Sequence, residues 1–222
     1  MTKKERALLC VQELQKVYPQ VKCSLNYSTP LEMLLATQMS AQCTDASVNK
    51  VTEKLFKKYK NANDFANADI RQLQEDIRSI GLYRNKSKNI IECCKKIISD
   101  YNGEVPSTME ELLTLPGTGR KTANLILGEI FKKPAVVVDT HCIRLSTRLG
   151  ITTNTTPYGI EQDLKKLIPE DKQLDFCHRL VYHGRAVCNA RSPKCDECTL
   201  REFCKYGKKI LKNMRSVPKD TI

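Results

Sequence analysis

The stretch from Leu115 to Arg144, LPGTGRKTANLILGEIFKKPAVVVDTHCIR, decides how the rest of this chain is interpreted. It opens with a tight Gly/Pro hairpin, Leu115 to Gly119, and continues into a helix that Lys121 starts. Two glycines let the backbone turn sharply and leave bare N–H groups near a partner. A helix N-terminus beside such a turn is an anion site, because its first N–H groups are unpaired and its dipole end is positive. The hairpin therefore predicts contact with a nucleic-acid phosphate.

The second half of the stretch supplies a carboxylate. Pro134 breaks the helical pattern, and a β-branched run from Val136 to Val138 leads to Asp139. An Asp before a helical run is a typical N-cap. The same group can stabilise developing positive charge or move protons, and capping would fix its orientation. Asp139 is therefore both a candidate cap and a candidate catalytic residue.

Taken together, these residues resemble the helix-hairpin-helix and Gly/Pro-Asp signature of DNA glycosylases, most closely the iron–sulfur endonuclease III branch. The resemblance continues in Ser40–Asp45 (SAQCTD), in Ile80–Tyr83 (IGLY) and in a C-terminal four-cysteine cluster, so it extends from about Leu31 to Cys204. A lone hairpin of this kind is also found in nonspecific DNA-binding proteins. The hairpin, Lys121, Asp139 and the cysteines in this order are more specific.

Charge points to the same class of partner. The 222 residues include 37 Lys+Arg and 25 Asp+Glu, a formal net charge of +12. A basic protein gains affinity for DNA by releasing counterions from the phosphates. With no tryptophan in the chain, a base-stacking platform of the single-strand-binding type is not favoured. The positive excess is concentrated after Cys204, where a single acidic residue, Asp220, faces Lys205, Lys208, Lys209, Lys212, Arg215 and Lys219.

The pattern of the eleven cysteines does not indicate a disulfide framework. Their number is odd, no signal peptide precedes them, and no apolar run approaches membrane-spanning length. A reducing intracellular compartment fits best: DNA-associated and cytoplasmic in a bacterium, nuclear or organellar otherwise. Seven cysteines lie scattered in apolar helical patterns, where a free thiol behaves as a small core residue: Cys10, Cys23, Cys43, Cys93, Cys94, Cys142 and Cys177.

The other four cysteines, Cys188, Cys195, Cys198 and Cys204, follow the spacing C-x6-C-x2-C-x5-C. A zinc site is one interpretation of this spacing, since four thiolates also make a tetrahedral zinc site. Zinc modules usually present two short C-x-x-C knuckles, however, whereas a four-iron cluster accepts one C-x-x-C with a single cysteine on either side. The spacing also matches the endonuclease III cluster loop, so the resemblance implies one [4Fe-4S] cluster. We interpret it as structural, shaping a basic loop for phosphates that includes Arg185, Arg191 and Lys194.

Helical periodicity predicts an all-α fold. Capping residues predict helix starts at Thr29, Asp45, Asp69, Ser107 and Thr156, and the segment from about Leu174 to Val187 reads as the last long helix. The resemblance implies two helical lobes with a DNA cleft between them. One would be residues 23–133, a bundle with the hairpin; the other would join residues 1–22 to residues 134–222 around the cluster.

Lys121 would be the nucleophile if the resemblance holds. Attack on a sugar C1′ needs a neutral amine, so its pKa must fall well below the free value of about 10.4. The helix dipole, nearby Arg120 and partial desolvation act in that direction. A lysine that only touches a phosphate is the alternative. In this family, a lysine at this position marks glycosylases that also have lyase activity.

A glycosylase must also fill the gap left by an extruded nucleotide. Gln42 and Leu82 match the family positions that do so, although a surface amide and a core leucine are the plain alternatives. With the glycines and arginines of the hairpin and cluster regions, they complete the predicted DNA contacts: Gln42, Leu82, Gly117, Gly119, Arg120, Arg144, Arg185, Arg191 and Lys194.

The sequence therefore predicts a bifunctional DNA glycosylase/abasic-site lyase of base excision repair. It would be a monomer acting on double-stranded DNA with damaged bases or abasic sites, and not on membranes. It would remove oxidised pyrimidines and nick the strand by β-elimination through a Lys121 Schiff base. A mismatch adenine glycosylase is one alternative, but such enzymes lack the lysine. A non-catalytic helix-hairpin-helix DNA-binding protein is the other, and it leaves the pairing of Lys121 with Asp139 unexplained.

Overall fold

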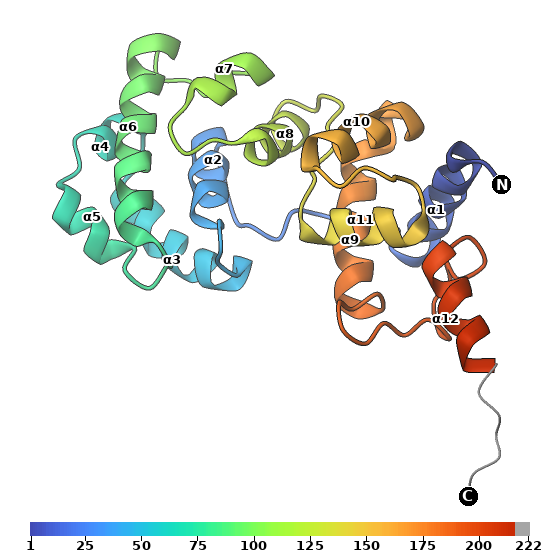
Figure 1. Cartoon of the computed structure of the whole chain (residues 1–222). Coiled ribbons are helices and arrows are strands. Elements are labelled where there is room, and N and C mark those ends of the chain that lie inside the picture. Colours follow the sequence, from blue (N-terminus) through green and yellow to red (C-terminus); the bar gives the residue numbers. More distant parts are fainter. Residues whose placement is uncertain (216–222) are drawn as a thin grey trace, which may run out of the picture. The chain divides into compact units, whose positions relative to one another are not determined.

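The computed structural model describes residues 1–215, which contain helices and connecting segments but no strand (Figure 1). The all-α prediction is therefore confirmed, and the buried run Val136–Val138 is irregular. The chain divides into two compact units, each of which packs mainly within itself. We call Cys23–Lys133 the central unit, and Met1–Lys22 with Pro134–Ile222 the terminal unit. We propose that these units are the two domains.

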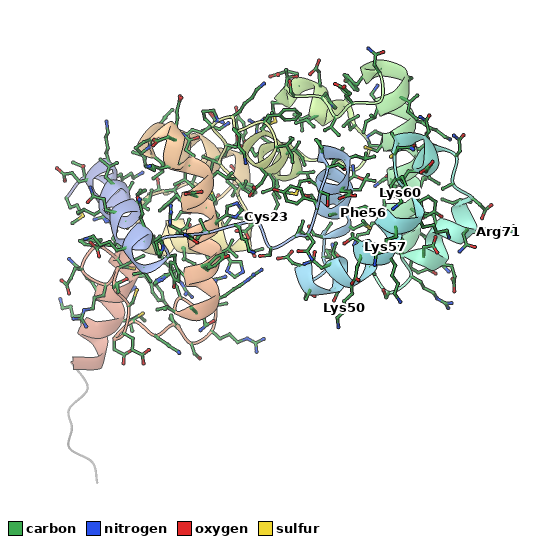
Figure 2. The ribbon with its side chains drawn as sticks, turned by 180° about the vertical axis from the view of Figure 1, so that it is seen from behind. Cys23, Lys50, Phe56, Lys57, Lys60 and Arg71 are labelled. Atoms are coloured by element: carbon green, nitrogen blue, oxygen red, sulfur yellow. The ribbon has the colours of Figure 1, made fainter. Side chains whose placement is uncertain are left out.

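The central unit is built around α2 (Pro30–Met39), which is buried from Met33 to Met39. Helix α2 packs against α3, α6 and α8, and α6 packs against α4 and α5. Exposed basic side chains cover the outer surface of α3 and the helices after it, including Lys50, Lys60 and Arg71 (Figure 2). The remaining helices are α3 (Asp45–Lys58), α4 (Ala62–Ala66), α5 (Ile70–Asp76), α6 (Tyr83–Tyr101), α7 (Met109–Thr114) and α8 (Arg120–Glu129).

The terminal unit joins the two ends of the chain. Helix α11 (Gln173–Ala186) packs against α1 and α9, and α10 packs on the same two helices. Buried Arg6 of α1 donates to the carbonyls of Phe203, at 2.9 Å, and Gly150, at 3.1 Å, which ties the first helix to the C-terminal loop. The other elements are α1 (Lys3–Val17), α9 (Thr140–Leu149), α10 (Pro157–Leu167), η1 (Glu170–Lys172) and α12 (Lys205–Arg215).

Helix α12 was not predicted, although Tyr206, Ile210 and Met214 recur at helical spacing among its basic residues. It covers Lys205–Arg215 of the predicted basic tail, and it packs on α9. Lys219 and Asp220 of that tail lie outside the described residues. None of the helices in residues 1–215 is both long enough and apolar enough to span a bilayer.

Most of the predicted helix caps are confirmed. The side chains of Thr29, Asp69 and Thr156 each accept a hydrogen bond from the N–H three residues later. Two predicted caps were wrong by one residue, because Thr44 caps α3 in place of Asp45, and Thr108 caps α7 in place of Ser107. In both cases the cap is the residue whose extended backbone lets its hydroxyl reach back to the first turn.

Candidate DNA-binding and catalytic site

The hairpin forms a tight turn at residues 115–118. The Thr118 N–H donates to the Leu115 carbonyl at 3.1 Å. Pro116 takes the second position of the turn, and Gly117 takes the third with φ +76°. A proline followed by a residue of positive φ is the pattern of a type II turn, in which glycine is preferred at the third position. The predicted chain reversal is therefore present, and its geometry requires Gly117.

A buried side-chain amide forms hydrogen bonds to this turn. The Gln38 side chain of α2 is 6% exposed, and its Nε2 donates to the Pro116 carbonyl and to Thr118 Oγ1, both at 3.0 Å. Its Oε1 is buried without a hydrogen-bond partner. Because one glutamine in an apolar helix gives no local signal, sequence reasoning missed Gln38.

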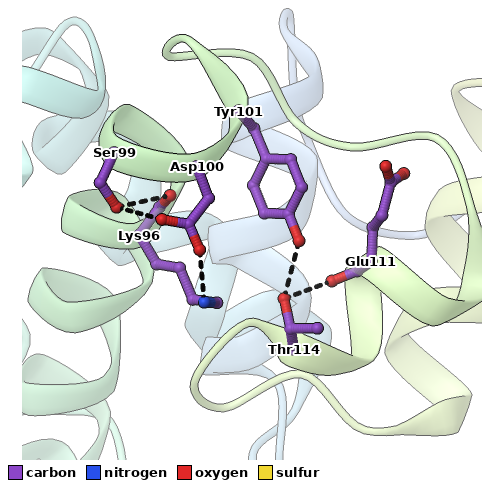
Figure 3. Close-up of polar contacts among 6 residues, drawn as sticks. All are labelled: Lys96, Ser99, Asp100, Tyr101, Glu111 and Thr114. Atoms are coloured by element: carbon purple, nitrogen blue, oxygen red, sulfur yellow. Dashed lines mark hydrogen bonds and ion pairs between the residues drawn. The ribbon is translucent and has the colours of Figure 1, made fainter.

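A second set of contacts holds the helix that precedes the turn. Tyr101, in the last turn of α6, hydrogen-bonds Thr114 Oγ1 at 2.9 Å, and that hydroxyl donates to the Glu111 carbonyl at 2.8 Å (Figure 3). Thr114 is the last residue of α7, so this pair fixes the point at which the chain enters the hairpin.

Helix α8 begins directly after the turn. Gly119 is its N-cap, so no side chain accepts a hydrogen bond from its first turn. Exposed Lys121 is its second residue, while Ala123 and Asn124 on the next turn are buried. A helix start without a side-chain cap, with an adjacent lysine and a positive dipole end, is suited to a phosphate.

Lys121 also lies close enough to Cys23 to act on its thiol. Burial raises the pKa of Cys23 to about 11, and the ammonium of Lys121 lowers it from a higher value. Glu129 and Asp45 act on the same thiol in the opposite direction. Within the central unit, the half-buried Cys23 thiol is therefore a neighbour of Lys121.

In the terminal unit, Asp139 caps α9. Its Oδ1 accepts from the Cys142 N–H at 2.7 Å, so the predicted capping role is confirmed. The Cys142 side chain is fully buried and hydrogen-bonds Cys177 of α11; that bond and burial hold its pKa well above the usual value for a thiol. This pair anchors the first turn of α9 and therefore the backbone from which Asp139 projects.

Gln42 and Leu82 are both exposed and both have left-handed backbone, with φ of +55° and +61°. Leu82 is 52% exposed, which rules out the core-packing alternative. Left-handed geometry is uncommon outside glycine, and for a bulky residue it is an outlier. Strain at an exposed apolar residue is characteristic of functional sites.

Arg144 is bound within the protein. Its Nε donates to the Cys188 carbonyl at 3.2 Å, and its Nη2 contacts the Gly184 carbonyl and His141 Nδ1, both at 3.1 Å. A Cβ at Gly184 would lie 2.5 Å from that ring nitrogen, so the glycine lets α9 and α11 approach closely. These bonds give Arg144 a structural role, and its predicted DNA contact stays a prediction. Arg185, in the last turn of α11, and Arg191 and Lys194, in the loop after it, are exposed.

The four clustered cysteines line one cavity. Burial and, to a smaller extent, the neighbouring cysteines raise the pKa of the Cys198 thiol to about 11. No three or more His, Cys, Asp or Glu side chains within residues 1–215 are placed to hold one metal ion. Four cysteine thiolates are the ligand set of a tetrahedral zinc site and also of a four-iron cluster, which takes one cysteine at each iron.

Donors surround the same sulfur atoms. The Gly207 N–H donates to Cys204 Sγ at 3.2 Å, Arg148 Nη1 contacts Cys188 Sγ at 3.4 Å, and His183 Nε2 lies 3.3 Å from Cys198 Sγ. Such donors suit thiolates that ligate a metal centre, because hydrogen bonds to the ligands orient them and stabilise their charge. The residues therefore fit an iron–sulfur cluster. Sequence reasoning missed Arg148 and His183, which contact the cysteines from α9 and α11.

Comparison with known proteins agrees with this geometry. Residues 35–170 match the HhH-GPD superfamily of base excision DNA repair proteins. An endonuclease III of Synechocystis sp. is 52% identical over 204 residues, which are 91% of this chain and 93% of that protein. The chain belongs to the endonuclease III family. This membership confirms the predicted resemblance and identifies a DNA glycosylase/abasic-site lyase of base excision repair.

Solved structures of the family support the same conclusion. A non-covalent endonuclease III–DNA complex is 44% identical, with a TM-score of 0.91, and covers 96% of this chain and 100% of its own. A trapped endonuclease III–DNA covalent intermediate, described as an estranged-adenine complex, is also 44% identical, with a TM-score of 0.90 over 95% of this chain and 100% of its own.

The two hairpin glycines provide a matched test of the turn. Gly117→Ala should lower the free energy of unfolding by about 1–2 kcal/mol, because alanine is disfavoured in left-handed backbone. In addition, the new Cβ would lie 3.0 Å from Asn89 Cβ. Gly119→Ala meets nothing within 4 Å and should change stability by less than about 0.5 kcal/mol. Urea unfolding of both variants measures the difference, and equal losses would contradict the assigned turn.

Proposed function

We propose that Lys121 is the nucleophile of this glycosylase/lyase and that its substrate is an oxidised pyrimidine in double-stranded DNA. The observation that carries the proposal is the placement of Lys121, exposed in the first turn of a helix that no side chain caps. The turn and the N–H groups of α8 would hold the backbone phosphate next to the lesion, which brings the target sugar to the lysine.

The reaction proceeds through the lysine amine. Neutral Lys121 Nζ attacks C1′, and the glycosidic bond breaks as the damaged base leaves with a proton. The sugar ring opens, and Nζ and C1′ form a Schiff base. Loss of a proton from C2′ then expels the 3′-phosphate by cleavage of the C3′–O bond, which nicks the strand.

Asp139 would act on the charge that builds during base release. A carboxylate lowers the barrier when it lies beside a deoxyribose that becomes positive, and it can move protons between nucleophile and leaving base. Capping supports this role, because the bond from the Cys142 N–H holds the carboxylate in one orientation.

Cys188, Cys195, Cys198 and Cys204 would hold one [4Fe-4S] cluster, which joins distant points of their loop into one rigid unit when it is bound. Arg148 supports this loop, because it also donates to the carbonyls of Asn189 and Ala190, both at 2.7 Å. Exposed residues of the same loop, such as Arg191, would then meet DNA phosphates. The protein would act as a monomer wherever the cell keeps its DNA.

Trapping experiments test the nucleophile. Borohydride should link the wild-type protein covalently to a duplex with an abasic site or an oxidised pyrimidine, because it reduces the Schiff base. Lys121→Gln should abolish the adduct while DNA binding survives, and Lys132→Gln serves as a charge-matched control in the same unit. If Lys121→Gln still gave the full yield of adduct, the nucleophile would be another amine.

Asp139 is tested by comparing two substrates. Asp139→Asn can still cap α9, so the thermal melt should be preserved. Removal of an electrostatic stabiliser typically slows the chemical step by about 10²–10³, and that loss is expected for a base-containing lesion under single-turnover conditions. A preformed abasic site bypasses glycosidic cleavage, so its loss should be smaller. Equal losses on both duplexes would assign Asp139 mainly to deprotonation of Lys121 or to elimination.

The cluster is tested by metal content. The purified protein should be yellow-brown and contain about four irons per chain. Cys198→Ser should reduce the iron content and the thermal stability together, whereas Cys94→Ser, at a buried cysteine of the central unit, should leave the iron unchanged. A colourless protein with stoichiometric zinc would overturn the cluster and leave the glycosylase proposal standing.

A further inference from the structure

Lys86, in the first turns of α6, is a buried cation that none of the proposed chemistry uses. Its side chain is 6% exposed, and burial lowers its pKa. Its Nζ donates to the carbonyl of Ala41 at 2.7 Å. The Cys43 thiol acts on the same ammonium in the opposite direction and raises its pKa.

The position of Lys86 joins two loops that are distant in sequence. Its backbone N–H donates to the Leu82 carbonyl at 3.0 Å, and its side chain reaches the carbonyl immediately before Gln42. The two loops also approach each other directly, because a Cβ at Gly81 would lie 3.9 Å from the Gln42 carbonyl oxygen. One residue therefore bonds to both of the segments that carry the exposed left-handed side chains.

A structural role alone does not explain a lysine here. Methionine would fill a similar volume without the free-energy cost of burying an ammonium that has one hydrogen-bond acceptor. The cost is offset if the bond to Ala41 holds a strained loop that apolar packing cannot hold. Ala41 and Gln42 are both exposed, so little packing restrains them.

We propose that Lys86 is a positioning residue that holds Gln42 and Leu82 together, so that both enter the gap left by the extruded nucleotide. The inference rests on the proposed function and on the prediction from the sequence that those two side chains fill the gap. Lys86 itself does not touch the DNA. It acts by keeping the two loops at a fixed separation before the DNA arrives, which spares the ordering cost on binding.

The test compares one lesion in two settings. In the first, an oxidised pyrimidine is paired in a duplex, so its extrusion leaves a gap beside the partner base. In the second, the same lesion lies in a single-nucleotide bulge, where there is no partner base to separate from it. Single-turnover excision is measured on both, and the ratio of the two rates is the readout, because the fraction of active protein cancels in that ratio.

Lys86→Met should lower the paired-to-bulged ratio by about tenfold, which corresponds to about 1.4 kcal/mol. Lys88→Met removes the same charge from an exposed position on the same helix and should leave the ratio unchanged. If Lys86→Met does not fold, Lys86→Gln keeps a shorter donor and should lower the ratio in the same direction.

A double-mutant cycle shows whether Lys86 acts through the Leu82 side chain. Leu82→Ala should lower the ratio by itself, and adding Lys86→Met should then have little further effect, because coupled residues are not additive. Independent, multiplying losses would overturn the proposal, as would an unchanged ratio in Lys86→Met. A wild-type protein that excises neither lesion would instead refute the proposed function.

Discussion

The first N–H groups of an α-helix have no partner inside that helix, so each helix start must be satisfied from outside. Threonine, asparagine or aspartate side chains do this at α1, α2, α3, α4, α5, α7, α9 and α10. Helix α11 also has no side-chain cap, but it continues directly from η1, whereas helices α6 and α8 begin at Leu82 and Gly119 without a side-chain cap and without a preceding helix. Both starts lie beside residues that we propose to meet DNA. A helix start without a side-chain cap can bind a polyanion through its N–H groups.

Such open starts need support from elsewhere, and buried polar side chains provide it. Gln38 holds the hairpin through the Pro116 carbonyl, and Lys86 holds the loop before α3 through the Ala41 carbonyl. Half-buried Arg148 holds the cysteine loop in a similar way, through two carbonyls. Loops carry few apolar side chains, so packing cannot fix them as it fixes helices. Each support has a cost: Gln38 Oε1 is left without a partner, and an unsatisfied buried group costs about 1–3 kcal/mol.

The difference between local patterns and contacts across many residues explains which features could be predicted from the sequence. The tight Gly/Pro turn, the Asp139 cap and the all-α class follow from residues within a few positions of one another, and each was predicted. Gln38 contacts the hairpin across 78 residues, and Lys86 contacts Ala41 across 45. Neither leaves a local pattern, because a polar residue in a helix is ordinarily at the surface. The helix start after the hairpin was predicted, whereas the start of α6 at Leu82 and the side chains that support both starts were not.

Asp139 shows how stability and catalysis can depend on one bond. Active sites usually cost stability, because groups arranged for chemistry are held in unfavourable positions. Here the bond from the Cys142 N–H to Asp139 Oδ1 stabilises the start of α9, a contribution of about 1 kcal/mol for a typical cap. Within the described residues Oδ2 makes no hydrogen bond, so one carboxylate oxygen remains for the substrate. A group already fixed by the fold needs no reorganisation when charge develops beside it, and this preorganisation is the source of electrostatic catalysis. The cap is therefore part of the catalytic device that we propose, and the fold bears no added strain to orient it.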